Sequence, residues 1–140
     1  MNAADAACAN ANLESSQSIN YLRSIVAQKC ERIIREIIIH CSATKEMKDF
    51  GAGDIRRWHL ERGFNDIGYR YVVRLDGTIE PGRPRAKAGA HCLNHNRHSI
   101  GVCYIGGLAS DGRTPKDTRT AEQRQALLSL LQHLIDRYPQ

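Results

Sequence analysis

The most informative segment of this chain reads Ile37-Ile38-Ile39-His40-Cys41-Ser42-Ala43-Thr44. Its β-branched residues predict a buried strand over 33–39, followed by a histidine and small polar residues. Because side chains alternate across a strand, we expect His40 and Cys41 to point to opposite faces. The end of the strand therefore places the His40 imidazole at the opening of a candidate active site. There His40 can serve either as a zinc ligand or as a hydrogen-bonded structural residue.

The rest of the sequence alternates between strand and helix patterns. This predicts a single domain with an α/β or α+β sandwich fold. Asp54 is a candidate N-cap for a helix over 55–62 that ends at Gly63. Asp76-Gly77 predicts a tight hairpin turn. Thr120 and Gln123 predict a capping box at the start of a helix over 120–138. The other expected elements are a helix over 18–30, strands over 69–75, 78–80 and 99–105, and loops over 81–96 and 108–119.

Length and composition place limits on the architecture. A chain of 140 residues can bury one core, and no apolar run is long enough to span a membrane. We expect residues 1–32 to form an N-terminal extension, partly disordered or helical, ahead of a domain over 33–140. The N-terminus lacks the cationic start and apolar stretch of a secretory signal, which predicts a cytoplasmic chain. Five cysteines without regular spacing predict free thiols.

The net charge of +5 is concentrated in the middle of the sequence. Between residues 56 and 97 there are nine Lys or Arg against four Asp or Glu. A basic patch favours a polyanionic partner, either nucleic acid or a bacterial wall, although it is also typical of a solvated surface. No aromatic interleaving or nucleic-acid motif accompanies these residues. Nucleic acid is therefore the less favoured partner.

Two further segments could carry chemistry. Tyr69 begins a predicted strand, where its hydroxyl could donate a hydrogen bond to a developing oxyanion or its ring could simply pack. The cluster His91-Cys92-x-x-His95-x-x-His98 places four potential metal donors within eight residues. Structural zinc sites usually draw donors from two separated segments, so this single segment also fits a polar loop that lines a groove. On the 55–62 helix, Trp58 is expected in the core, with His59 beside it.

Six motifs follow one another at set intervals: Ile38-Ile39-His40-Cys41-Ser42-Ala43-Thr44, Ile55-Arg56-x-Trp58-His59, Asp66-Ile67-Gly68-Tyr69-x-x-Val72-Val73, Asp76-Gly77-Thr78-Ile79-Glu80-x-Gly82-Arg83, Gly89-Ala90-His91 and Asn96-x-x-Ser99-Ile100-Gly101-Val102. Their order resembles that of the zinc-dependent N-acetylmuramoyl-L-alanine amidases of the amidase-2 type. This family includes bacteriophage amidase-type lysozymes and peptidoglycan recognition proteins. The resemblance extends from about residue 36 to residue 138, most of the chain.

The resemblance implies a fold, a substrate and roles for four residues. It implies an α/β domain with a mixed central β-sheet flanked by helices and a groove for peptidoglycan. It also implies hydrolysis of the amide between N-acetylmuramic acid and L-alanine, on the cell wall after release. His40 would be a metal ligand for Zn, and Tyr69 would be catalytic, near the metal-bound water. His91 and Asn96 would be substrate-binding residues. The chemistry is coherent because zinc lowers the pKa of bound water to about 7 and polarises the carbonyl.

The resemblance also implies two more zinc ligands, a histidine and a cysteine or aspartate, in a segment beyond the last helix. The sequence given ends at Gln140 without them. A catalytic zinc normally has three protein donors and a water. We therefore expect an amidase domain whose zinc site is incomplete in this chain. The alternative is a non-catalytic peptidoglycan-binding module that uses the same groove.

Overall fold

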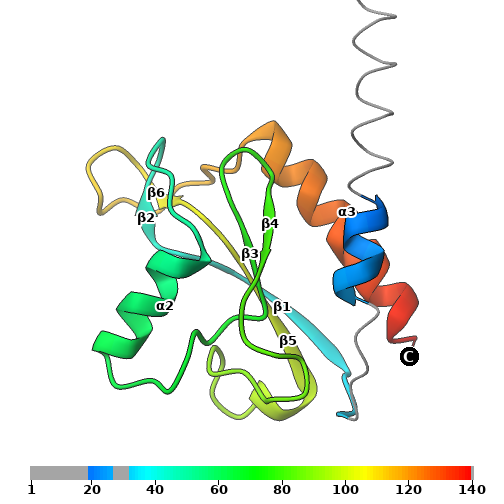
Figure 1. Ribbon diagram of the computed structural model, residues 1–140. Coiled ribbons are helices and arrows are strands. Elements are labelled where there is room, and N and C mark those ends of the chain that lie inside the picture. Colours follow the sequence, from blue (N-terminus) through cyan, green and yellow to red (C-terminus); the bar gives the residue numbers. More distant parts are fainter. Residues whose placement is uncertain (1–18, 27–31, 140) are drawn as a thin grey trace, which may run out of the picture.

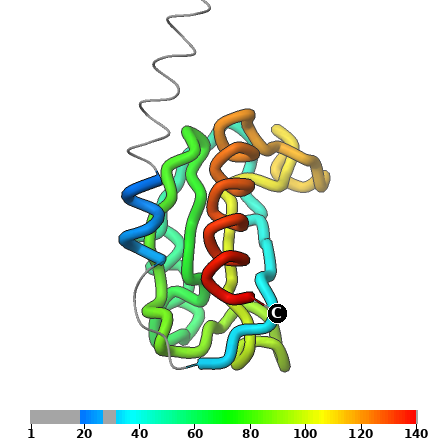
Figure 2. Tube along the Cα trace, turned by 90° about the vertical axis from the view of Figure 1, so that its right-hand side faces the viewer, coloured from blue at the N-terminus to red at the C-terminus, as the bar shows by residue number. Residues whose placement is uncertain are grey.

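The computed structural model describes residues 19–26 and 32–139. A four-stranded sheet in the order β1-β5-β3-β4 lies at the centre, with a small β2-β6 pair at one end (Figure 1). Helix α2 covers one face of the sheet, and α3 with the helix over residues 19–26 covers the other (Figures 1 and 2). The predicted α/β fold with a mixed sheet and flanking helices is confirmed. The elements are β1 (Glu36–Cys41), β2 (Thr44–Lys45), α2 (Ala52–Glu61), β3 (Tyr71–Val73), β4 (Ile79–Pro81), the 3-10 helix η1 (Asn96–His98), β5 (Ser99–Tyr104), β6 (Gly107–Leu108) and α3 (Ala121–Arg137).

The sheet is parallel except at one edge. β1 and β3 both run parallel to β5, and β4 returns antiparallel to β3. The β3–β4 connection is the predicted hairpin, in which Gly77 has a φ of 84° and the Asp76 carboxylate accepts the Thr78 N–H. A positive φ is accessible to glycine without steric cost, which explains its place in this turn.

An apolar core lies on each face of the sheet, so the central strands are buried on both sides. Tyr71 and Val73 of β3 point into the core under α3, and Val72 points into the core under α2. All three side chains are fully buried, as expected for a strand covered by helices on both faces. The core under α3 is closed by Leu22, Ile25 and Val26 of the 19–26 helix and by Leu127, Leu130 and Leu134 of α3.

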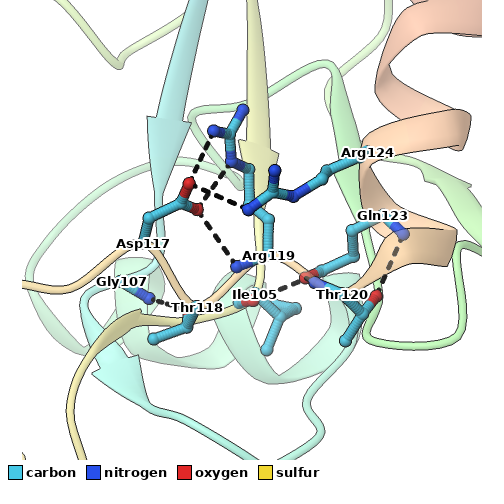
Figure 3. A network of polar contacts seen from close by, with 8 residues as sticks. All are labelled: Ile105, Gly107, Asp117, Thr118, Arg119, Thr120, Gln123 and Arg124. Atoms are coloured by element: carbon cyan, nitrogen blue, oxygen red, sulfur yellow. Dashed lines mark hydrogen bonds and ion pairs between the residues drawn. The ribbon is translucent and has the colours of Figure 1, made fainter.

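The start of α3 is held by the fully buried Gln123 (Figure 3). Its backbone N–H donates to the Thr120 hydroxyl at 3.0 Å, and its side-chain oxygen accepts the Thr120 N–H at 3.0 Å. This is the capping box that the sequence predicts. The Gln123 side-chain nitrogen also donates to the carbonyls of Ile105, at 2.8 Å, and Val73, at 3.3 Å. The helix is therefore anchored directly to the ends of β3 and β5.

An ionic contact orders the loop that leads into α3. The Asp117 carboxylate accepts two hydrogen bonds from the Arg119 guanidinium at 2.8 Å, and Arg124 approaches the same carboxylate at 3.2 Å (Figure 3). The Thr118 hydroxyl in the same loop accepts the Gly107 N–H at 2.7 Å. The ion pairs are solvent-exposed, so we attribute to them loop geometry rather than much stability.

β1 lies later in the sequence than predicted, over Glu36–Cys41 instead of 33–39. Its partner strand sets this range, because the parallel register pairs Glu36 with Ser99 and Cys41 with Tyr104. His40 therefore lies inside the strand, opposite Cys103, rather than just after it. The imidazole is thereby held by a hydrogen-bonded backbone on a sheet face.

The start of α2 also differs from the prediction. The helix begins at Ala52 with Gly51 as its N-cap, so Asp54 is the third helical residue and not the cap. The Asp54 carboxylate accepts the Gly51 N–H at 2.9 Å, and the distant Glu80 carboxylate accepts the Ala52 N–H at 3.1 Å. Local sequence could not reveal the contribution of Glu80. Gly63, with a φ of 89°, follows the helix as predicted.

Other boundaries move by a few residues. β3 is shorter than the predicted 69–75, and the two-residue strands β2 and β6 were not predicted at all. Residues 19–26 confirm part of the predicted 18–30 helix, and its remainder lies outside the described residues. Cys41, Cys92 and Cys103 have free thiols, as predicted. No helix in the described ranges has both the length and the apolar content that crossing a membrane requires.

Candidate active site

Three residues of the candidate site converge on the α2 side of the sheet. His40 comes from β1, Tyr69 from the segment before β3, and His91 from the loop before η1. The His40 ring centroid lies 5.3 Å from that of Tyr69 and 5.0 Å from that of His91, and the Tyr69 and His91 centroids are 6.3 Å apart. The residues that the sequence nominated from three separate motifs therefore share one site.

Alternate residues of β5 form the floor beneath these rings. Ser99, Gly101 and Cys103 face the same side of the strand, and all three are buried. A side chain at Gly101 would collide with the His91 ring, because its Cβ would lie 2.5 Å from Cδ2 and 2.6 Å from Cγ. Small residues on β5 therefore make the space that the imidazole of His91 fills.

His91 is hydrogen-bonded at both ring nitrogens. Its Nδ1 lies 2.9 Å from His40 Nε2, and its Nε2 lies 3.2 Å from the Ser99 hydroxyl. Burial lowers the pKa of His40, and burial with the charges of His40, Arg32 and Arg83 lowers the pKa of His91 to about 4. Both imidazoles are therefore neutral near pH 7 and can share hydrogen bonds without charge repulsion.

Tyr69 keeps its proton at neutral pH. Burial raises the pKa of Tyr69 to about 12, with further contributions from the thiols of Cys103 and Cys41. A phenol in this state donates a hydrogen bond, and it is suited to stabilise negative charge that develops on an oxygen nearby. The catalytic role that the resemblance implies for Tyr69 stays a prediction.

Asn96 stabilises the loop that carries His91 through hydrogen bonds within the protein. Its side-chain oxygen accepts the N–H groups of His91, at 2.9 Å, and Cys92, at 3.0 Å. The amide therefore fixes the backbone from which the His91 ring projects. The predicted contact of Asn96 and His91 with substrate stays a prediction.

His59 is the residue of this region that the sequence did not single out. It is 6% exposed, its Nδ1 accepts the Gly68 N–H at 2.9 Å, and its ring centroid lies 5.4 Å from that of Tyr69. Its position four residues after the buried Ile55 places both on the inner face of α2. The spacing of four residues between Ile55 and His59 is the feature of the sequence that indicates burial of His59. Trp58, expected in the core, is half-buried and packs with Phe50 against the core under α2.

The buried state of His59 predicts a pH dependence of stability. Burial and the charges of Arg62 and Arg83 lower the pKa of His59 below 6.5. The unfolded chain therefore binds more protons, and the free energy of unfolding decreases as the pH falls below about 6.5. His59→Asn retains an acceptor near Nδ1 but does not titrate. We expect urea unfolding at several pH values to show a smaller slope for the variant, whereas equal slopes would contradict this role.

The histidine cluster after His91 does not form one metal site. His95 Nδ1 contacts the Glu36 carboxylate at 2.8 Å, and His98 Nδ1 contacts the Ile33 carbonyl at 3.3 Å. Among the described residues, no three His, Cys, Asp or Glu side chains converge as a metal site would require. These residues alone therefore do not fit a catalytic zinc, since His40 is the one member of the implied ligand set that they include.

A positively charged pocket adjoins the site. Arg32, Arg70, Arg83 and Lys87 line it together with Gly89, Ser99 and Gly101. The last three residues also lie against the His91 ring. The basic central part of the sequence is thus partly gathered next to the candidate site, where it favours an anionic partner.

Comparison with known proteins agrees with this geometry. The sequence model of the N-acetylmuramoyl-L-alanine amidase family matches residues 30–140. An endolysin of Klebsiella phage KP32 is 45% identical over 103 residues, which make up 74% of this chain and 68% of the endolysin. The residues that the family model matches thus include His40, Tyr69, His91 and Asn96.

Two solved structures share the fold. The endolysin N-acetylmuramoyl-L-alanine amidase LysCS of Clostridium intestinale has a TM-score of 0.65 at 27% identity, covering 76% of this chain and 64% of that one. Drosophila peptidoglycan recognition protein SA has a TM-score of 0.62 at 25% identity, covering 79% of this chain and 64% of that one. This chain thus spans slightly less than two thirds of each structure.

The mixed sheet with its histidine- and tyrosine-lined face defines an amidase-2 type of domain. This chain belongs to the N-acetylmuramoyl-L-alanine amidase family.

Proposed function

We propose that this chain acts on bacterial peptidoglycan and cleaves the amide between N-acetylmuramic acid and L-alanine. The observation that carries the proposal is the convergence of His40, Tyr69 and His91 on one sheet face in a member of this family. The basic side chains of Arg32, Arg83 and Lys87 beside the site favour a wall polymer that carries carboxylates and phosphates. We further propose that the chain reaches the wall after release from the cell that makes it.

The residues of the site take distinct roles in this proposal. Tyr69 donates its O–H to the substrate carbonyl as negative charge develops on the oxygen. His91 and Asn96 contact the substrate in this proposal. They do so with atoms other than the His91 ring nitrogens and the Asn96 side-chain oxygen, which have partners within the protein. A hydrogen-bond donor that is already in position does not have to reorganise during the reaction. The buried, protonated phenol of Tyr69 is such a donor, and it stabilises the transition state for this reason.

Zinc is the cofactor we propose, with His40 as one of its ligands. When bound, zinc activates water and polarises the amide carbonyl. The described residues do not supply the other donors, so these must come from elsewhere on this chain or another. We expect elemental analysis to find about one zinc per chain, and His40→Ala to lose it, because three protein donors are the usual minimum. His95→Ala, which alters a histidine paired with Glu36, is the matched control. Absence of zinc from the purified chain would contradict this cofactor.

Tyr69→Phe tests the catalytic step. We expect the variant to sediment with purified sacculi as the unchanged chain does, and to release wall peptide about 100-fold more slowly, since one lost donor to an oxyanion costs that much. Tyr104→Phe is the control, because Tyr104 lies on the opposite face of β5 against the α3 core. Undiminished hydrolysis by Tyr69→Phe would remove Tyr69 from the mechanism.

A non-catalytic peptidoglycan-binding module is the second candidate. The observation that favours it is the incomplete donor set among the described residues. It predicts sedimentation with sacculi that survives both a chelator and His40→Ala, without release of peptide. Failure of the chain to sediment with sacculi under any condition would contradict both candidates.

A further inference from the structure

His91 is held in one orientation from several sides. Its ring fills the space above Gly101, and a Cβ at Gly89 would lie 2.5 Å from its Cδ2. Asn96 fixes its backbone N–H at 2.9 Å. The ring therefore has little freedom to turn over, and its two nitrogens face fixed partners. Those partners are His40 Nε2 and the hydroxyl of Ser99, whose residue is 1% exposed.

This chain of contacts allows two arrangements of protons, because each neutral imidazole carries one N–H. In the first, the Ser99 hydroxyl donates to His91 Nε2, and His91 Nδ1–H donates to His40 Nε2. His40 then carries its proton on Nδ1. In the second, His40 Nε2–H donates to His91 Nδ1, and His91 Nε2–H donates to the Ser99 oxygen. His40 Nδ1 is then an unprotonated lone pair.

The second arrangement is favoured by the chemistry of imidazole. A neutral histidine side chain prefers to carry its proton on Nε2, and only the second arrangement places both protons there. It also depends on Ser99, since a partly buried His91 Nε2–H without an acceptor would incur the cost of an unsatisfied donor. The two rings must change tautomer together, because a single hydrogen bond joins them.

We propose that Ser99 is a positioning residue that accepts the His91 Nε2–H and thereby holds both His91 and His40 in the Nε2–H tautomer, with His40 Nδ1 unprotonated. Ser99 acts through His91 and does not touch the reacting atoms.

The test is the tautomer of each ring, measured by long-range ¹H–¹⁵N correlation NMR on the full chain near neutral pH with a chelator present. In the unchanged chain we expect His40 and His91 both to carry the proton on Nε2. In Ser99→Ala we expect both rings to shift toward the Nδ1–H form together. Ser99→Thr, which retains the hydroxyl, should restore the original signals. Ser129→Ala on α3 serves as the control and should leave them unchanged.

Two results would overturn the proposal: a proton on Nδ1 of His40 in the unchanged chain, or unaltered tautomers in Ser99→Ala. The first requires no variant, so the proposal remains testable even if Ser99→Ala does not fold. The measurement needs neither substrate nor metal. Its failure would therefore be distinct from failure of the chain to hydrolyse peptidoglycan.

Discussion

Gly68→Ala should lower the free energy of unfolding by about 3 kcal/mol, the upper end of the cost of overpacking. The alanine Cβ would collide with the backbone carbonyl of Ala90, which cannot swing away as a long side chain can. Gly68 also receives the Ala90 N–H at 3.1 Å and donates to His59 at 2.9 Å, so both contacts would be strained. Since Ala90 precedes His91, the site should be displaced as well. Equilibrium urea unfolding measures the first effect, and sedimentation with sacculi measures the second.

Gly53→Ala provides a matched control of opposite sign. A Cβ at Gly53 meets nothing within 4 Å, and the residue lies in α2 with an exposed surface. Alanine is favoured over glycine in a helix by up to about 1 kcal/mol, so this variant should be slightly stabilised. Equal effects of the two substitutions would contradict the close approach of Gly68 to Ala90.

Gln123→Leu should cost about 3 to 5 kcal/mol of unfolding free energy. The substitution keeps the volume of the side chain but removes hydrogen bonds to Val73, Ile105 and Thr120. Each buried polar group left without a partner costs about 1 to 3 kcal/mol. Because α3 is anchored to the strand ends only partly by apolar contact, loss of this side chain should also loosen the helix. Urea unfolding followed by circular dichroism would show a lower midpoint.

Gln125→Leu is the control for Gln123. Gln125 is exposed on the same helix, and exposed substitutions of this kind usually change stability by less than about 0.5 kcal/mol. A similar loss for both variants would mean that the buried hydrogen bonds of Gln123 contribute nothing specific.

Much of the fold could be predicted from local sequence. The capping box of Thr120 and Gln123, the Asp76-Gly77 turn and the apolar β5 each depend on neighbours in the chain, and each is present. The predicted boundaries are wrong where residues distant in the sequence determine the start or the range of an element. Glu80 helps to set the start of α2, and β5 sets the range of β1. The pair β2 and β6 exists only through contact between the two segments.

The candidate site is likewise only partly predictable from the sequence. Separate motifs predict His40, Tyr69 and His91 as site residues, and the structure brings them together. The sequence could not show that His91 bonds to Ser99, because that contact depends on the space above Gly101. The sequence places His59 beside Trp58 and gives it no role, whereas its spacing from Ile55 puts it on the buried face of α2.

Product analysis tests the central claim most directly. Purified sacculi would be incubated with the chain and zinc, and the soluble products identified by mass spectrometry. Cleavage of the proposed amide predicts stem peptides with a free L-alanine N-terminus and glycan strands that keep their N-acetylmuramic acid. Products in which muramic acid and L-alanine remain joined, or no soluble products from sacculi that bind the chain, would contradict an amidase.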